Sequence, residues 1–132
     1  MNYSKQRDLI LKIVKENRIH PTVEWVHGEA KKKMPHIGMA TVYRNLNILV
    51  DNGLIERISI PGEPVRFDGF TGEHFHMKCI KCGKLIDLSS EDPESLNQLK
   101  TDINSIFGIN AGDIKLCTML LEGTCNKCQS IK

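Results

Sequence analysis

The chain has 132 residues, of which 40% are hydrophobic and 26% are charged, as in an ordinary globular protein. No apolar run reaches the length of a membrane span, and the start lacks the profile of a signal peptide, so we expect a cytoplasmic protein without a membrane partner. The net charge of +2 is too small to indicate nucleic-acid binding, yet residues 1–50 carry nine Lys and Arg against four acidic residues. A basic N-terminal half suits a DNA-facing module, with a solvated helical surface as the alternative.

The first half of the chain predicts three helices and a hairpin. Capping residues open the first two helices, and apolar residues at helical spacing give each helix an inner face. The expected elements are helices from Ser4 to about residue 17, from Thr22 to about Met34 and over 39–52, then strands over 54–60 and 64–68. This order is typical of a winged helix-turn-helix domain, whose third helix enters the major groove of DNA.

A glycine-rich segment, residues 69–72, separates this half from the rest. Beyond it the pattern predicts strands over 73–79, 84–89 and 114–122, with a helix over 93–107 before the last strand. The sequence therefore predicts an α+β protein. Its N-terminal winged helix-turn-helix domain covers 1–70, and a C-terminal α/β domain covers 71–132.

Four of the five cysteines form two C-x-x-C pairs, Cys79 with Cys82 and Cys125 with Cys128. Four thiolates suit a tetrahedral structural zinc ion (Zn2+), whose binding free energy becomes folding free energy. Two unrelated redox or buried pairs are the alternative. Cys117 lies in an apolar run, and we expect it to be a small buried hydrophobe.

A second candidate metal site lies on the expected strands. His74 and His76 point to one face of a strand and Cys79 to the other, so the histidines belong to a different site. The spacing suits a metal pair, and an exposed edge-strand pair is the alternative. Asp87, within an apolar strand, is either a third ligand or a surface carboxylate.

These residues together resemble the ferric uptake regulator (Fur) family over nearly the whole chain. The matching motifs are His20-Pro21-Thr22, Ala40-Thr41-Val42-Tyr43-Arg44-Asn45-Leu46, Gly53-Leu54-Ile55, Arg66-Phe67-Asp68, His74-x-His76-x-x-Cys79-x-x-Cys82-Gly83 and Cys125-x-x-Cys128. The resemblance implies a homodimeric repressor of palindromic operator DNA, not an enzyme, with a C-terminal domain that dimerises and senses metal. It also implies a regulatory Fe2+ or Mn2+ ion held by His20, Asp68, His74, His76 and Asp87.

Within the family, this ligand set is most similar to that of the peroxide sensors. Iron sensors usually carry Glu at the position of Asp87 and often a further His at the position of Glu73. The peroxide branch implies that hydrogen peroxide is the signal and that bound Fe(II) leads to oxidation of His20 or His74. Arg44 is instead typical of iron sensors, so an iron-responsive repressor is the alternative.

The third helix carries the expected DNA contacts. Tyr43 is expected to contact a base or thymine methyl group, and Arg44 to read guanine or phosphate. The full set is Thr41, Tyr43, Arg44 and Asn45, with Lys31, Lys32 and Lys33 as phosphate contacts.

Two rival function classes remain open: a non-haem Fe(II) oxygenase using His74, His76 and Asp87, and a structural zinc-ribbon module.

Overall fold

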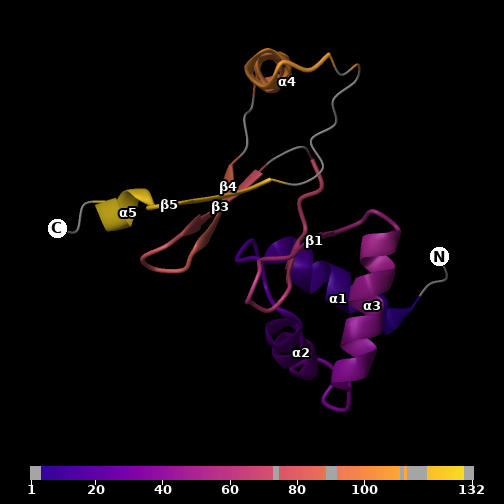
Figure 1. Ribbon diagram of the computed structural model, residues 1–132. Helices are drawn as coiled ribbons and strands as arrows, with labels where there is room; N and C mark the ends of the chain where they lie inside the picture. The colour runs from indigo at the N-terminus through magenta and orange to yellow at the C-terminus, as the bar shows by residue number, and fades with distance from the viewer. Residues whose placement is uncertain (1–3, 73–74, 89–91, 111, 113–118, 130–132) are drawn as a thin grey trace. The chain divides into compact units, whose positions relative to one another are not determined.

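A computed structural model describes residues 4–72, 75–88, 92–110, 112 and 119–129 (Figure 1). The chain divides into two units, Met1–Gly72 and Glu73–Lys132. Within the described part of the chain, no helix combines the length and the apolar character needed to cross a membrane.

Unit 1 begins with three helices, α1 (Lys5–Glu16), α2 (Val23–Lys31) and α3 (Met39–Asp51), shown in Figure 1. Both expected N-caps are confirmed. The Ser4 hydroxyl accepts the N–H of Arg7 at 3.3 Å, and the Thr22 hydroxyl accepts the N–H of Trp25 at 3.2 Å. Each hydroxyl satisfies a backbone donor that the first turn of a helix leaves without an intrahelical acceptor.

The core of unit 1 lies between these helices and the strand that follows them. Its buried side chains come from every third or fourth position of each helix, as the apolar spacing predicts. They are Ile10, Ile13, Val14, Val26, Ala30, Ile37, Val42, Leu46, Leu49, Ile55 and Phe67. Burial of each large aliphatic side chain stabilises the unit by roughly 1.5–3 kcal/mol.

The second helix ends at Lys31, about three residues before the expected end near Met34. The N–H groups of Lys32 and Lys33 bond to the carbonyls three residues earlier, which tightens the last turn. His27 then donates through Nε2 to the carbonyl of Ile37 at 2.9 Å. This bond fixes the turn that leads into α3.

The wing is an antiparallel hairpin of β1 (Glu56–Ile58) and β2 (Arg66–Asp68), with Glu56 opposite Asp68. Both strands are shorter than expected. Leu54 bonds to the last turn of α3, and Gly62 turns the chain with φ +79, so the flanking residues leave the ladder. Three helices followed by this hairpin confirm the winged helix-turn-helix layout.

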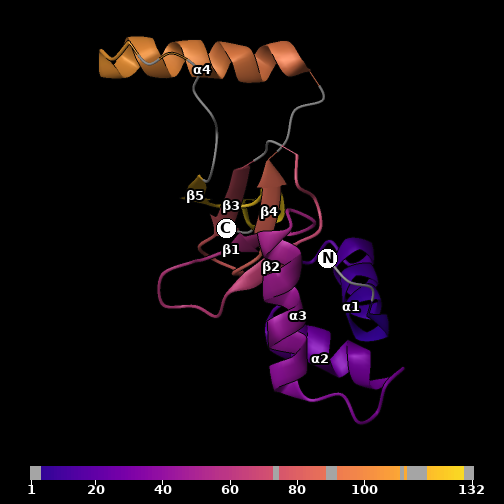
Figure 2. The same cartoon turned by 90° about the vertical axis from the view of Figure 1, so that its right-hand side faces the viewer.

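Unit 2 contains a three-stranded sheet, with β3 (Phe75–Cys79) between β4 (Leu85–Leu88) and β5 (Leu120–Gly123), as Figure 2 shows. The β3 strand is antiparallel to β4 and parallel to β5. The helix α4 (Pro93–Phe107) has the expected bounds, and Gly108 ends it in the left-handed conformation.

The last expected strand, 114–122, lies partly outside the described residues, and the described strand extends to Gly123. A short helix that the sequence did not predict, α5 (Asn126–Gln129), carries the second cysteine pair. Helices and a mixed sheet in the same chain confirm the α+β class.

Candidate metal and DNA-binding sites

The four cysteines of the two C-x-x-C pairs converge in unit 2. Cys79 ends β3 and Cys82 follows in the turn, where Gly83 has φ +75 and donates its N–H to the Cys79 carbonyl at 2.9 Å. The parallel pairing of β5 with β3 brings Cys125 and Cys128 to the same end of the sheet. The four sulfur atoms all lie within 4.8 Å of one another.

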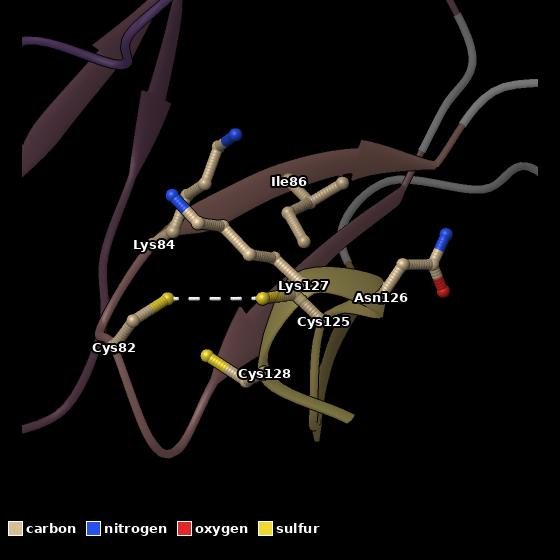
Figure 3. Close-up of a pocket in the computed structure, with 7 residues that line it drawn as sticks. All are labelled: Cys82, Lys84, Ile86, Cys125, Asn126, Lys127 and Cys128. Atoms are coloured by element: carbon tan, nitrogen blue, oxygen red, sulfur yellow. Dashed lines mark hydrogen bonds between the residues drawn. The ribbon is translucent and has the colours of Figure 1, made fainter. Parts of the chain in front are cut away.

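The spacing of these sulfurs fits zinc. Four thiolates at the usual Zn–S distance of about 2.3 Å form a tetrahedron with edges of roughly 3.8 Å. The Cys82 and Cys125 Sγ atoms lie 3.8 Å apart, and Figure 3 shows their sulfurs facing that of Cys128. Three of the cysteines are buried, so an ion among the sulfurs is largely shielded from water.

Local hydrogen bonds stabilise the thiolate form of Cys79, one of the four cysteines of this cluster. The backbone N–H groups of Cys125 and Cys82 point at the Cys79 Sγ from 3.4 and 3.5 Å and lower the pKa of that thiol to about 5. The pKa of Cys128 rises to about 12, because its thiol shares hydrogen bonds with Cys125 and is buried. The opposite pKa shifts of Cys79 and Cys128 mean that these two thiols are both ionised near neutral pH only when a cation compensates their charge.

A cavity of about 570 Å³ opens beside the cysteines, and Lys84 and Lys127 line it. Figure 3 shows both side chains extending on one side of the Cys82–Cys125 pair. A zinc ion with four thiolates carries a net charge of about −2, and two ammonium groups beside it compensate that charge.

Unit 1 holds a buried pair of a histidine and a carboxylate. His20 Nε2 lies 3.5 Å from Asp68 Oδ2, and the residues are 3% and 2% exposed. The N–H of Phe67 donates to the Pro21 carbonyl at 2.9 Å, which fixes the loop of His20 beside β2. His20 has φ 57, a left-handed conformation that costs an ordinary side chain roughly 1–2 kcal/mol. Such strain is typical of functional positions.

Unit 2 holds a second pair of the same kind. His76 and Asp87 are register partners on β3 and β4, and the His76 Nε2 lies 3.2 Å from the Asp87 Oδ1. His76 is buried and Asp87 is partly buried, which accounts for a carboxylate inside an apolar strand. His74 lies outside the described residues.

The donor atoms of both pairs, imidazole nitrogen and carboxylate oxygen, suit Fe(II) or Mn(II) better than a softer thiolate-preferring ion. Sequence spacing alone indicated no role for His20 or Asp68. Their burial, their proximity and the backbone conformation of His20 distinguish them. A rare left-handed histidine leaves no local signal in the sequence.

The α3 helix presents a polar face opposite its buried side chains. Tyr43 is 53% exposed, and the exposed Arg44 donates to the Thr41 hydroxyl at 3.4 Å. Asn45 is placed differently, because its side chain is buried and donates to the Thr41 carbonyl at 2.9 Å. This position favours a role within the helix over a contact with a base.

The three consecutive lysines lie at the end of α2 and in the turn after it, and all are exposed. Lys32 forms an ion pair with Glu29, with 2.8 Å between the ammonium nitrogen and the carboxylate oxygen. A surface ion pair of this kind is weak, so Lys32 can exchange it for a phosphate.

Residues 1–116 match the model of the ferric uptake regulator family. The chain belongs to this family. The peroxide-responsive repressor PerR of Staphylococcus saprophyticus is 31% identical over 127 residues, covering 94% of this chain and 80% of that protein.

Two solved structures are similar to this fold. One is the Helicobacter pylori ferric uptake regulator, a protein with three functional metal binding sites. Its TM-score is 0.78 at 25% identity, covering 98% of this chain and 83% of that one. The other is the Campylobacter jejuni peroxide stress regulator, with a TM-score of 0.72 at 32% identity, covering 93% of this chain and 88% of that one.

Proposed function

We propose that this member of the ferric uptake regulator family is a metal-dependent repressor that binds palindromic operator DNA as a homodimer. The observation that carries the proposal is the presence of two His–carboxylate pairs with buried histidines, His20 with Asp68 in unit 1 and His76 with Asp87 in unit 2. We infer that one Fe(II) or Mn(II) ion binds both pairs together with His74. An ion with ligands from both units stabilises the conformation in which the two units lie close together. This preference couples metal binding to DNA binding.

The four cysteines are proposed to hold a structural zinc ion. All four coordination positions are then occupied by thiolates, which leaves no open position for a signal or a substrate. The buried sulfurs and the Lys84 and Lys127 side chains support a permanent ion that stabilises unit 2.

Domain 1–70 is proposed to bind DNA through α3 in the major groove. The exposure of Tyr43 supports its role as a base contact, and that of Arg44 supports a contact with guanine or phosphate. Lys31, Lys32 and Lys33 then contact the phosphates, which makes the affinity dependent on salt.

Domain 71–132 is proposed to dimerise. Near the end of α4, Ile106 and Phe107 are 73% and 71% exposed, and Leu121 is exposed on β5. The β5 strand lies at one edge of the three-stranded sheet. Large exposed apolar side chains and a sheet edge are the features that a second copy of the chain covers.

Hydrogen peroxide is the proposed signal. A peroxide-responsive relative and a peroxide stress regulator among the similar structures support this branch, as does Asp87 in the ligand set. Bound Fe(II) would activate the O–O bond of hydrogen peroxide, and the peroxide itself would be the two-electron oxidant, with no net loss of electrons from the iron. The net change on the protein is one oxygen atom inserted at a ring carbon of His20 or His74, with the second oxygen leaving as water. An oxidised imidazole is a poorer ligand, so the ion and the DNA are released.

The test compares the Fe(II) and Mn(II) forms on DNA selected by the protein from a random pool. Both forms are expected to bind, and peroxide should release only the Fe(II) form while adding one oxygen atom to a histidine. Fragmentation must place that oxygen on a ring, since Met77 is also readily oxidised. An Fe(II) form that ignores peroxide and releases DNA on chelation would identify an iron-responsive repressor. Repeated turnover of an added substrate would identify an oxygenase.

A further inference from the structure

The two carboxylate oxygens of Asp68 face different partners. Oδ2 lies 3.5 Å from the imidazole of His20. Oδ1 accepts the backbone N–H of Phe70 at 2.9 Å and lies 3.9 Å from Nε of Arg18. One oxygen therefore faces the proposed metal ligand, and the other faces the segment by which the chain leaves unit 1.

Arg18 also contacts this exit segment, residues 69–72. Its guanidinium carbon lies 5.1 Å from the centre of the Phe70 ring, a cation–π distance. The same guanidinium thus contacts both the Asp68 carboxylate and the side chain two residues further along. A lysine could keep the charge but not the planar group that makes both contacts.

Two glycines of the exit segment, Gly69 and Gly72, lie close to neighbouring atoms. A Cβ on Gly69 would lie 2.8 Å from the Cα of Lys15, and a Cβ on Gly72 would lie 2.7 Å from Cζ of Phe70. Lys15 donates to the Gly69 carbonyl at 3.3 Å. The missing Cβ of Gly69 lets the segment lie against the end of α1, and that of Gly72 lets the Phe70 ring approach the backbone of the same segment.

We propose that Arg18 is a positioning residue that links metal binding at Asp68 to the conformation of the exit segment. By holding Oδ1 and covering Phe70, the guanidinium keeps Oδ2 beside His20 for the ion. Binding of the ion and ordering of residues 69–72 then favour each other. The proposal rests on the proposed function, because it takes Asp68 as a metal ligand.

The test uses the full chain loaded with zinc, in wild-type form and as Arg18→Lys and Phe70→Leu. Arg18→Lys keeps the charge near Asp68, so a change reports the geometry of the guanidinium. An exposed cation–π contact corresponds to a factor of about two to five in an equilibrium constant. Mn(II) affinity, measured by the electron paramagnetic resonance of free Mn(II), should fall by about that factor in each variant. The double variant should lose little more, since both act through one contact.

A second readout needs no metal at the regulatory site. The Phe70 amide donates to Asp68 Oδ1, so its hydrogen exchange should accelerate by a similar factor in Arg18→Lys, with the exchange of Ile10 and Val14 unchanged. Arg57→Lys, a substitution of an exposed arginine on β1, is the matched control. It should leave both the Mn(II) affinity and the hydrogen exchange of Phe70 unchanged. Wild-type Mn(II) affinity or wild-type Phe70 exchange in Arg18→Lys would overturn the proposal.

Failure of the proposed function gives a different pattern. If Asp68→Asn binds Mn(II) as tightly as the wild type, Asp68 is not a ligand and both proposals are wrong. If Asp68→Asn loses Mn(II) while Arg18→Lys behaves as the wild type, only the role of Arg18 is wrong.

Discussion

Cys79→Ser removes one of the four sulfur ligands of the proposed zinc site. Cys79 is fully buried, and its Sγ lies close to the N–H groups of both Cys82 and Cys125. A serine hydroxyl is not ionised near neutral pH and is a poor zinc ligand. We expect the variant to lose zinc and the structure of the sheet in unit 2, with unit 1 retained.

The free energies involved support a complete loss of the folded sheet in unit 2. Structural zinc contributes roughly 10–16 kcal/mol to small domains at neutral pH, whereas the whole stability of a typical domain is about 5–15 kcal/mol. The buried cluster around the sulfurs consists of Cys79, Cys125 and Cys128 with Ile86 packed against it, so little apolar packing there replaces the ion. The core of unit 1 is built from residues of that unit alone and does not depend on zinc.

The assay is zinc content together with hydrogen exchange of the full chain, read by mass spectrometry. Amides of β3 and β4 should lose protection in Cys79→Ser, and those of α1 and α3 should keep it. Ile80→Ser is the matched control, because Ile80 lies in the same turn but is 64% exposed. A Cys79→Ser protein that retains zinc and a protected β3 strand would refute the assignment.

Two further predictions concern DNA and the signal. Tyr43→Ala should weaken operator binding by about tenfold or more in fluorescence anisotropy and leave the melting temperature unchanged, whereas its buried neighbour Val42→Ala should destabilise unit 1 by about 1–3 kcal/mol. Equal effects of the two variants on stability would show that the orientation assigned to α3, with Tyr43 exposed and Val42 buried, is wrong. Asp87→Glu lengthens the side chain that now lies 3.2 Å from His76, and it should keep metal-dependent DNA binding but lose much of the peroxide response. A full response in this variant would contradict the role given to the Asp87 side chain.

Much of unit 1 could be predicted from the sequence, because its signals are local. Ser4 and Thr22 cap helices whose apolar residues recur at helical spacing, and both the caps and the buried faces are where the pattern predicts them. Strand ends were less predictable. Whether Leu54 joins a strand depends on its bond to the end of α3, which no local pattern encodes.

The candidate sites also differ in whether a local sequence pattern predicts them. The two C-x-x-C pairs indicate a zinc site by spacing alone, because the motif itself makes the turn that orients the thiolates. The pairing of His20 with Asp68 depends on a bond between distant backbone groups and on an uncommon φ. Asn45 matches the family motif, yet its side chain bonds within its own helix, and motif position alone did not predict that orientation.

In the proposed function, one regulatory ion binds a His–carboxylate pair from each unit. Titration of zinc-loaded protein with Mn(II) should give one regulatory ion per chain. His20→Ala in unit 1 and His76→Ala in unit 2 should each remove that ion and abolish operator binding, without loss of zinc. Two independent Mn(II) sites, or a variant in one unit that leaves a full-affinity site in the other, would contradict the account.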